Sequence, residues 1–140
     1  NVCRRGIRTI VALMALVFLL VACEGYTQTG AKRVENQGPT GGNLAVQIST
    51  ANGSIEESIE IEDGSGTTLD ARVILTVRKG SYKIELLGAD GEVTLSLEAA
   101  GNETVTGQGH MAVDSFGEAN YRVTAVDAES IEYIIEYTYR

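Results

Sequence analysis

The amino-acid sequence predicts an all-β fold, an antiparallel β-sandwich of about eight strands, over residues 43–140. From residue 43 onward apolar and polar residues alternate, which is typical of strands with one buried and one solvated face. Polar turns separate these runs, and no segment combines a helical period with capping residues. The architecture is immunoglobulin-like or jelly-roll-like. The chain has two cysteines and no tryptophan, so the cysteine pair around a tryptophan that marks a true immunoglobulin domain is absent.

Eight runs of alternating apolar residues account for the predicted strands. In chain order they cover residues 44–48, 55–61, 69–77, 82–86, 93–97, 111–113, 121–125 and 131–139. Asn52-Gly53 predicts a hairpin between the first two, because both residues tolerate a positive φ. Turns are predicted at residues 88–91 and 114–117. The stretch 99–109 is the least regular, with three glycines, and we expect it to cross between the sheets.

The first 23 residues have the layout of a secretory signal. Arg4, Arg5 and Arg8 give a basic start without acidic residues, and an uncharged apolar run over residues 10–22 ends at Cys23. A helix that spans a bilayer needs about 20 apolar residues, so this run is short for a permanent anchor. We therefore expect a cleaved signal over residues 1–22.

The residues LVAC at positions 20–23 resemble the lipobox of bacterial lipoproteins, in which an aliphatic residue and two smaller residues precede a cysteine. The resemblance covers residues 1–23 only. It implies that the thiol of Cys23 receives a diacylglycerol group and that cleavage falls directly before it. The chain would then be lipid-anchored and extracytoplasmic, on the cell membrane or the outer membrane. The alternatives are an uncleaved single-pass anchor and a signal whose cysteine merely lies near the cleavage site.

The composition of residues 24–42 predicts a flexible tether. This stretch is rich in Gly, Thr, Gln and Asn, contains the sole proline, Pro39, and has no sustained apolar period. The expected organisation is therefore a signal over 1–22, lipidated Cys23 with its tether over 23–42, and the β-sandwich over 43–140. Removing residues 1–22 takes away three basic residues and no acidic one, so the formal charge falls from −8 to −11. Such an acidic body is repelled by anionic lipid headgroups and argues against nucleic acid as a partner.

Candidates for catalysis are few. His110 is the single histidine, and Ser115 or Ser130 with Asp114 or Asp127 could in principle join it in a triad. No serine lies in a G-x-S-x-G motif, which would place a nucleophile on a strained turn. We therefore expect no catalytic residue, no cofactor and no bound metal, and we expect that the protein is not an enzyme.

Acidic residues gather around two predicted turns. Glu60, Glu62, Asp63 and Asp70 flank one turn, and residues 90–92 form the other. Calcium is bound by several loop oxygens in a regular spacing, which the first cluster lacks. We favour a solvated acidic edge that discourages strand pairing between molecules, with structural calcium as the alternative.

The aromatic residues divide into core and surface candidates. Tyr133, Tyr137 and Tyr139 alternate along the last predicted strand, on the parity of its isoleucines, so we expect them in the core or at its rim. Phe116 and Tyr121 lie near the turn before the seventh strand and are the better candidates for exposed rings that stack on a sugar.

The leading hypothesis is a non-catalytic binding or structural module of the cell envelope, held at a membrane through lipid on Cys23. Its partner would be an envelope protein, a polysaccharide or a neighbouring copy. The alternative is an accessory lipoprotein that binds a small ligand, a glycan or calcium for a transporter or an envelope enzyme. The folded part of the sequence contains no motif that decides between them.

Overall fold

A computed structural model describes residues 25–140, which form seven strands and one short 3₁₀ turn. The elements are β1 (Thr27–Thr29), β2 (Lys32–Gln37), β3 (Gly41–Glu60), β4 (Thr68–Leu87), η2 (Ala89–Gly91), β5 (Val93–Ala100), β6 (Glu103–Ala112) and β7 (Glu118–Tyr139). All pairings between these strands are antiparallel, which confirms the predicted fold class. The expected signal and Cys23 lie outside the described residues. Within residues 25–140, no helix has the length and apolar character that crossing a bilayer requires.

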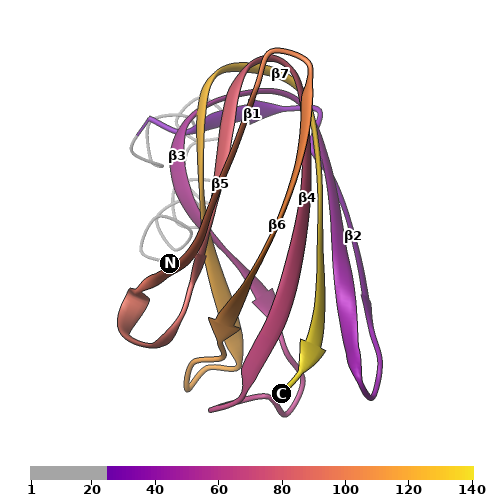
Figure 1. Ribbon diagram of the computed structural model, residues 1–140, viewed down its shortest axis with the longest axis vertical. Helices are drawn as coiled ribbons and strands as arrows, with labels where there is room; N and C mark the ends of the chain where they lie inside the picture. The colour runs from indigo at the N-terminus through magenta and orange to yellow at the C-terminus, as the bar shows by residue number, and fades with distance from the viewer. Residues whose placement is uncertain (1–24) are drawn as a thin grey trace, which may run out of the picture.

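Three long strands form the centre of one continuous sheet. The strand order is β1-β3-β7-β4-β5, and β2 also pairs with β3 while β6 also pairs with β4. The strands β3, β4 and β7 each run through one layer, bend over at the upper end in Figure 1, and return through the other layer. The register shifts between Ala51 and Gly53 on β3, and between Lys79 and Ser81 on β4, mark this bend. The sandwich is therefore one sheet folded onto itself.

This folding corrects four details of the sequence prediction. The expected hairpin at Asn52-Gly53 is a bend within β3, where Gly53 has a φ of 99°. In the same way the expected strands 69–77 and 82–86 are halves of β4, and 121–125 and 131–139 are halves of β7. The stretch 99–109 crosses between the layers as expected, but it is regular, because it holds the end of β5 and most of β6. A bulge at a bend interrupts the alternation just as a turn does, so the sequence pattern does not separate the two.

The two layers share one hydrophobic core. The first layer contains β2, β6 and residues 41–48, 68–77 and 131–139 of the long strands, and the second contains β5 and residues 53–60, 81–87 and 118–126. Inward-facing side chains from both layers are fully enclosed, among them Leu44, Val73, Ile84, Met111 and Ile135. The alternation read from the sequence thus assigns the buried face correctly in every long strand.

One open side of the sandwich is closed by polar side chains of β2. The Arg33 guanidinium donates to the Ser58 carbonyl oxygen at 2.6 Å, and Gln37 Nε2 donates to the Glu60 carbonyl oxygen at 2.9 Å. The Gln37 side chain also accepts from the Glu62 N–H at 3.0 Å. These contacts satisfy backbone groups along the free edge of β3. Residues 27–29 and 32–37 are therefore strands of the sheet, and the expected tether over them is wrong. The inward residues of β2 are polar, so the stretch shows no apolar period.

The other open side is closed by direct contact between β5 and β6. The Thr94 hydroxyl donates to the His110 carbonyl and accepts from the His110 N–H at 3.2 Å. Gly109 lies on the inward face of β6, where a Cβ atom would come within 2.7 Å of the Leu95 Cβ. Glycine at this position allows the two edges to approach each other closely.

A cluster of four buried tyrosines, Tyr26, Tyr82, Tyr121 and Tyr133, joins the two layers; we call it the tyrosine cluster. The rings of Tyr82 and Tyr133 stack with centroids 5.9 Å apart, and the hydroxyls of Tyr121 and Tyr133 are hydrogen-bonded at 2.9 Å. The Tyr82 hydroxyl is enclosed and has no hydrogen bond of normal geometry; it lies close to the hydroxyl of Tyr26, which donates to Gln28 at 2.7 Å. The Tyr121 hydroxyl is thus hydrogen-bonded, whereas the Tyr82 hydroxyl lacks a partner of normal geometry.

This difference predicts opposite effects for two matched substitutions. Tyr82→Phe removes an unpaired buried hydroxyl, so the free energy of unfolding should stay the same or rise by about 1 kcal/mol. Tyr121→Phe leaves the Tyr133 hydroxyl without this partner, so the free energy of unfolding should fall by about 1–2 kcal/mol. Urea denaturation of both variants measures the difference. Equal destabilisation by the two would show that the Tyr82 hydroxyl has a partner in solution.

Candidate functional site

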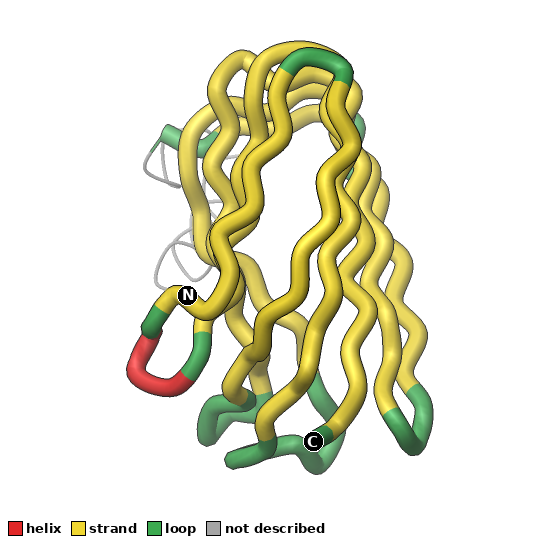
Figure 2. The backbone as a smooth tube through the Cα atoms, in the orientation of Figure 1, coloured by secondary structure: helices red, strands yellow, loops and turns green. Residues whose placement is uncertain are grey.

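The two ends of the sandwich differ in character. The loops of residues 61–67, 88–92 and 113–117 collect at one end, which we call the loop end and which lies at the bottom of Figure 2. The opposite end, which we call the fold-over end, contains the bends of β3, β4 and β7 at residues 51–53, 79–81 and 127–130, together with the β5–β6 turn. Loops on a rigid scaffold are the common location of binding residues, so the loop end is the candidate site.

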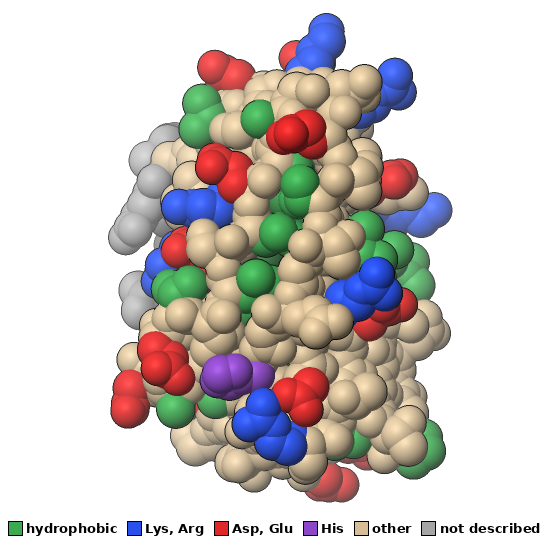
Figure 3. All heavy atoms as spheres, viewed as in Figure 1, with side chains coloured by type: hydrophobic (Ala, Val, Ile, Leu, Met, Phe, Trp, Pro, Cys, Tyr) green, Lys and Arg blue, Asp and Glu red, His purple; other side chains and the backbone are tan. Residues whose placement is uncertain are grey.

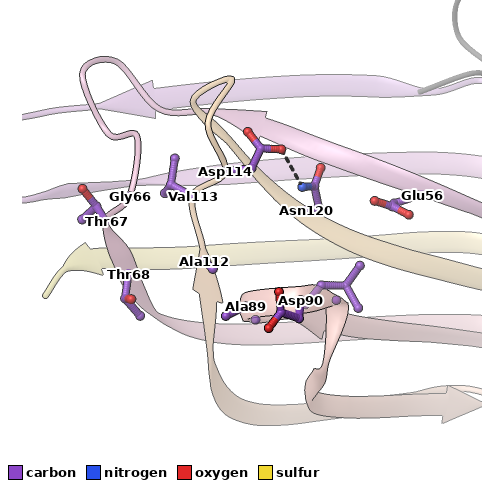
Figure 4. A pocket seen from close by; sticks show the side chains of 13 residues that line it. Glu56, Gly66, Thr67, Thr68, Ala89, Asp90, Ala112, Val113, Asp114 and Asn120 are labelled. Atoms are coloured by element: carbon purple, nitrogen blue, oxygen red, sulfur yellow. Dashed lines mark hydrogen bonds between the residues drawn. The ribbon is translucent and has the colours of Figure 1, made fainter.

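A pocket of about 510 Å³ opens at the loop end between residues from several elements. Figure 4 shows Thr67 from the β3–β4 loop, Asp90 from η2, and Asp114 and Asn120 from either side of the β6–β7 turn, with Glu56 of β3 beside them. Backbone of Gly66, Gly88 and Gly91 completes the wall. The exposed lining is mostly apolar, and it carries carboxylate, amide and hydroxyl groups, which bind polar ligands by hydrogen bonds.

Asp114 holds the turn beside this pocket in one conformation. Its Oδ1 accepts from the N–H groups of Phe116 at 2.9 Å and Glu118 at 3.0 Å, and its Oδ2 accepts from Asn120 Nδ2 at 3.2 Å. The Gly117 N–H donates to the Asp114 carbonyl at 3.0 Å. Both carboxylate oxygens are thus engaged in the turn, which fixes its shape.

Phe116 lies at the tip of this fixed turn and is 82% exposed. An exposed aromatic ring can stack on a ligand, and a rigid backbone lowers the entropy lost when it does so. The loop end therefore combines an apolar platform on an ordered turn with a pocket that carries carboxylate, amide and hydroxyl groups. This arrangement can bind a ligand that has both an apolar face and hydroxyl or amide groups.

The sequence-predicted aromatic residues have mixed outcomes. Phe116 is exposed as predicted, and Tyr133 and Tyr137 are buried and Tyr139 partly buried as predicted. The prediction that Tyr121 is exposed is wrong, because its side chain is fully buried in the tyrosine cluster. Tyr121 lies on the inward parity of β7, and its closeness to the turn was a weaker signal than that parity.

The residues considered for a catalytic triad divide between the two ends of the sandwich, with Asp114 and exposed Ser115 in one turn at the loop end. His110 is partly exposed on β6, with Nε2 3.9 Å from Glu92 Oε1, and a histidine is visible on the surface in Figure 3. Ser130 and Asp127 lie at the fold-over end, where β7 bends. Asp114 is engaged in its own turn. The structure therefore does not bring His110 together with either Ser130 or Asp127.

At the acidic turn around residues 60–70, one of the carboxylates pairs with a basic side chain. Asp70 forms an ion pair with Arg140 at 2.6 Å, and this hydrogen bond lowers the pKa of the Asp70 carboxyl. Within the described part of the chain, no three His, Cys, Asp or Glu side chains gather in the manner of a metal site.

The pocket residues Glu56, Thr67 and Asn120 had no sequence signal beyond their outward parity or a place beside a turn.

Comparison with known proteins gives distant likenesses only. No protein-family model and no curated protein sequence matches the chain. One similar solved structure is a carbohydrate-binding module of Cellvibrio mixtus lichenase 5A in complex with cellotriose, at 15% identity and a TM-score of 0.39, covering 80% of this chain and 88% of that one. Another is a xylan-binding domain from Paenibacillus barcinonensis, at 11% identity and a TM-score of 0.40, covering 82% and 84%.

A third likeness is to a structure of Bacillus endospore appendages, described as disulfide-linked pili. It has 11% identity and a TM-score of 0.45, and covers 81% of this chain and 91% of that one. At these values none of the three likenesses assigns a family or a ligand to this chain.

Proposed function

We propose that this protein is a non-catalytic glycan-binding module of the bacterial cell envelope, anchored to a membrane by lipid on Cys23, with the loop end as its binding surface. The observation that carries the binding proposal is Phe116, an exposed ring on a turn whose Asp114 fixes the backbone and also lines the loop-end pocket. The anchor is supported by the lipobox resemblance at residues 20–23.

The chemistry of the loop end suits a sugar chain. A sugar ring has an apolar face of C–H groups, which stacks on an aromatic ring, and an edge of hydroxyls, which donate to carboxylates and accept from amides. Phe116 offers the ring, and Glu56, Asp90 and Asn120 offer the polar groups. Asp114 is engaged in its own turn, and Ser130 and Asp127 lie at the fold-over end away from His110, which supports a non-catalytic role.

Replacing Phe116 by alanine tests the platform. Loss of one stacking contact of about 1.4 kcal/mol should weaken glycan binding roughly tenfold, with no loss of stability because the side chain is exposed. The measurement is binding of the full-length protein in detergent to a glycan array, followed by titration with the best binder.

The matched control is Val126→Ala, which removes another exposed apolar side chain at the fold-over end and should leave binding unchanged. A flat array for the unsubstituted protein, or equal affinity for the Phe116 variant, would overturn the glycan proposal. A fragment starting at residue 43 is unsuitable for this test, because it lacks β1 and β2.

A further inference from the structure

The structure assigns an orientation to the anchored protein: we propose that the fold-over end rests against the lipid headgroups and the loop end points away from the membrane. This inference rests on the lipid anchor of the proposed function, because the anchor fixes one point of the chain at the bilayer. The orientation follows from the place at which the described chain enters the sandwich.

The chain joins the sheet at the fold-over end. Tyr26 is 6% exposed and belongs to the tyrosine cluster, and β1 pairs immediately afterwards with residues 50–52 of β3, beside the bend. A Cβ atom on Gly53, at the bend itself, would overlap the carbonyl oxygen of Gly25. The indigo start of the described chain accordingly lies at the upper end in Figure 1. The protein is thus fixed from Tyr26 onward.

Very little chain separates this fixed point from the expected lipid. Only Glu24 and Gly25 lie between Cys23 and Tyr26 in the sequence. Three Cα–Cα steps of 3.8 Å span at most about 11 Å. The tether expected from the sequence, with 19 residues over positions 24–42, would have an average span of about 22–26 Å. Because β1 and β2 use most of that stretch, the domain is held at the headgroups instead of standing off.

The candidate binding surface is then at the far end. The second half of β3 runs from the bend to the loop end over residues 53–60, which at about 3.3 Å per residue gives roughly 26 Å. With the strand upright, the turn that carries Phe116 and the pocket would project from the membrane by about this length. A ligand would therefore reach the loop end from the side facing away from the bilayer, as a polymer lying over the membrane would.

Charge does not set this orientation by itself. Arg78 and Lys79 are exposed at the fold-over end, but Asp127 and Glu129 of the neighbouring strand are exposed there too. Figure 3 shows both basic and acidic side chains at its upper end. The loop end carries acidic residues on all three of its loops, so anionic headgroups repel it. The short connection to Cys23 holds one end at the bilayer, and the repulsion keeps the other end away.

The experiment uses introduced thiols as position markers. The chain has two cysteines, Cys3 in the expected signal and Cys23 at the expected lipid site, so a cysteine introduced into the mature lipidated protein would be its sole free thiol. Lys79→Cys marks the fold-over end and Ser115→Cys marks the loop end, and both positions are exposed. Each variant is spin-labelled, reconstituted in vesicles that contain Ni²⁺-chelating lipid, and tested for relaxation enhancement by the headgroup nickel.

We expect a several-fold stronger enhancement for the label at position 79 than at position 115. A Gly-Ser insertion of about 12 residues between Glu24 and Gly25 should reduce this difference without detaching the protein. Equal enhancement at both positions, or a stronger effect at position 115, would overturn the orientation.

A flotation assay separates this failure from failure of the anchor. The Cys23→Ser variant should no longer be found in the membrane fraction. If this variant still floats with vesicles, lipid anchoring itself is contradicted. If Cys23→Ser is released and the two labels are nevertheless equivalent, the anchor stands and the orientation is wrong.

Discussion

Gly80→Ala is expected to lower the free energy of unfolding by about 3 kcal/mol or more. Gly80 lies where β4 bends, with a φ of 71°, and a Cβ atom there would overlap the Asp127 carbonyl oxygen of the adjacent strand. The Gly80 carbonyl also accepts from the Gly101 N–H at 3.0 Å, which ties the β5–β6 turn to the bend. Relief of the overlap would require β4 and β7 to separate where the whole sheet folds over.

The matched control is Gly101→Ala at the same end of the molecule. Gly101 also has a positive φ, 44°, but a Cβ atom there would meet nothing within 4 Å. This substitution should therefore cost only the local backbone strain, about 1 kcal/mol. Urea denaturation gives both values. If the two variants lost the same stability, close packing of β4 against β7 at the bend would not be what requires glycine at position 80.

The second large effect is loss of stability at alkaline pH. Burial raises the pKa of Tyr26 to about 12, and burial raises the pKa values of Tyr82, Tyr121 and Tyr133 further. In the unfolded chain these phenols titrate near pH 10. Above that pH the unfolded state has released protons that the folded state retains, so the free energy of unfolding falls as the pH rises. Below pH 10 the contribution is fully present.

The size of this effect follows from the number of tyrosines in the cluster. Each contributes a slope of about 1.4 kcal/mol per pH unit, so four give about 5 kcal/mol per unit until the folded-state pKa of Tyr26 is reached. A domain with an ordinary stability of about 5–15 kcal/mol should then unfold within one to three pH units above pH 10.

Parallel titrations followed by tyrosinate absorbance and far-ultraviolet circular dichroism check this expectation. The cluster tyrosines should ionise only as the strand signal is lost, and Tyr82→Phe should reduce the pH slope by about one quarter, since it removes one of four groups. Ionisation of all tyrosines near pH 10 in a protein that keeps its strand signal would contradict burial of the cluster.

The sequence pattern was sufficient for local structure but not for connectivity. Alternation placed Leu44, Val73, Ile84 and Ile135 correctly on buried faces, because side-chain direction in a strand depends only on parity. It divided β3 into two strands at Asn52-Gly53, because a glycine with positive φ serves a bend as well as a hairpin. Which of the two forms depends on the neighbouring strands, whose bends coincide here.

The sequence likewise predicted only part of the candidate site. The turn at residues 114–117 and the exposure of Phe116 follow from local composition, since Asp114 bonds to backbone groups within its own turn. The pocket beside it does not, because Glu56, Asp90 and Asn120 come from segments far apart in the chain. Tyr121 was misassigned because a residue near a turn can still face inward.

The sequence by itself determined the all-β antiparallel class, the faces of the strands, the acidic charge and the resemblance of residues 20–23 to a lipobox, since each depends on residue type and short-range spacing. Only the tertiary structure decided that residues 27–37 belong to the sheet and that the chain enters the sandwich at the fold-over end. The physical reason is that Arg33 and Gln37 find their partners on β3, more than twenty residues away, so no local pattern of hydrophobicity records them.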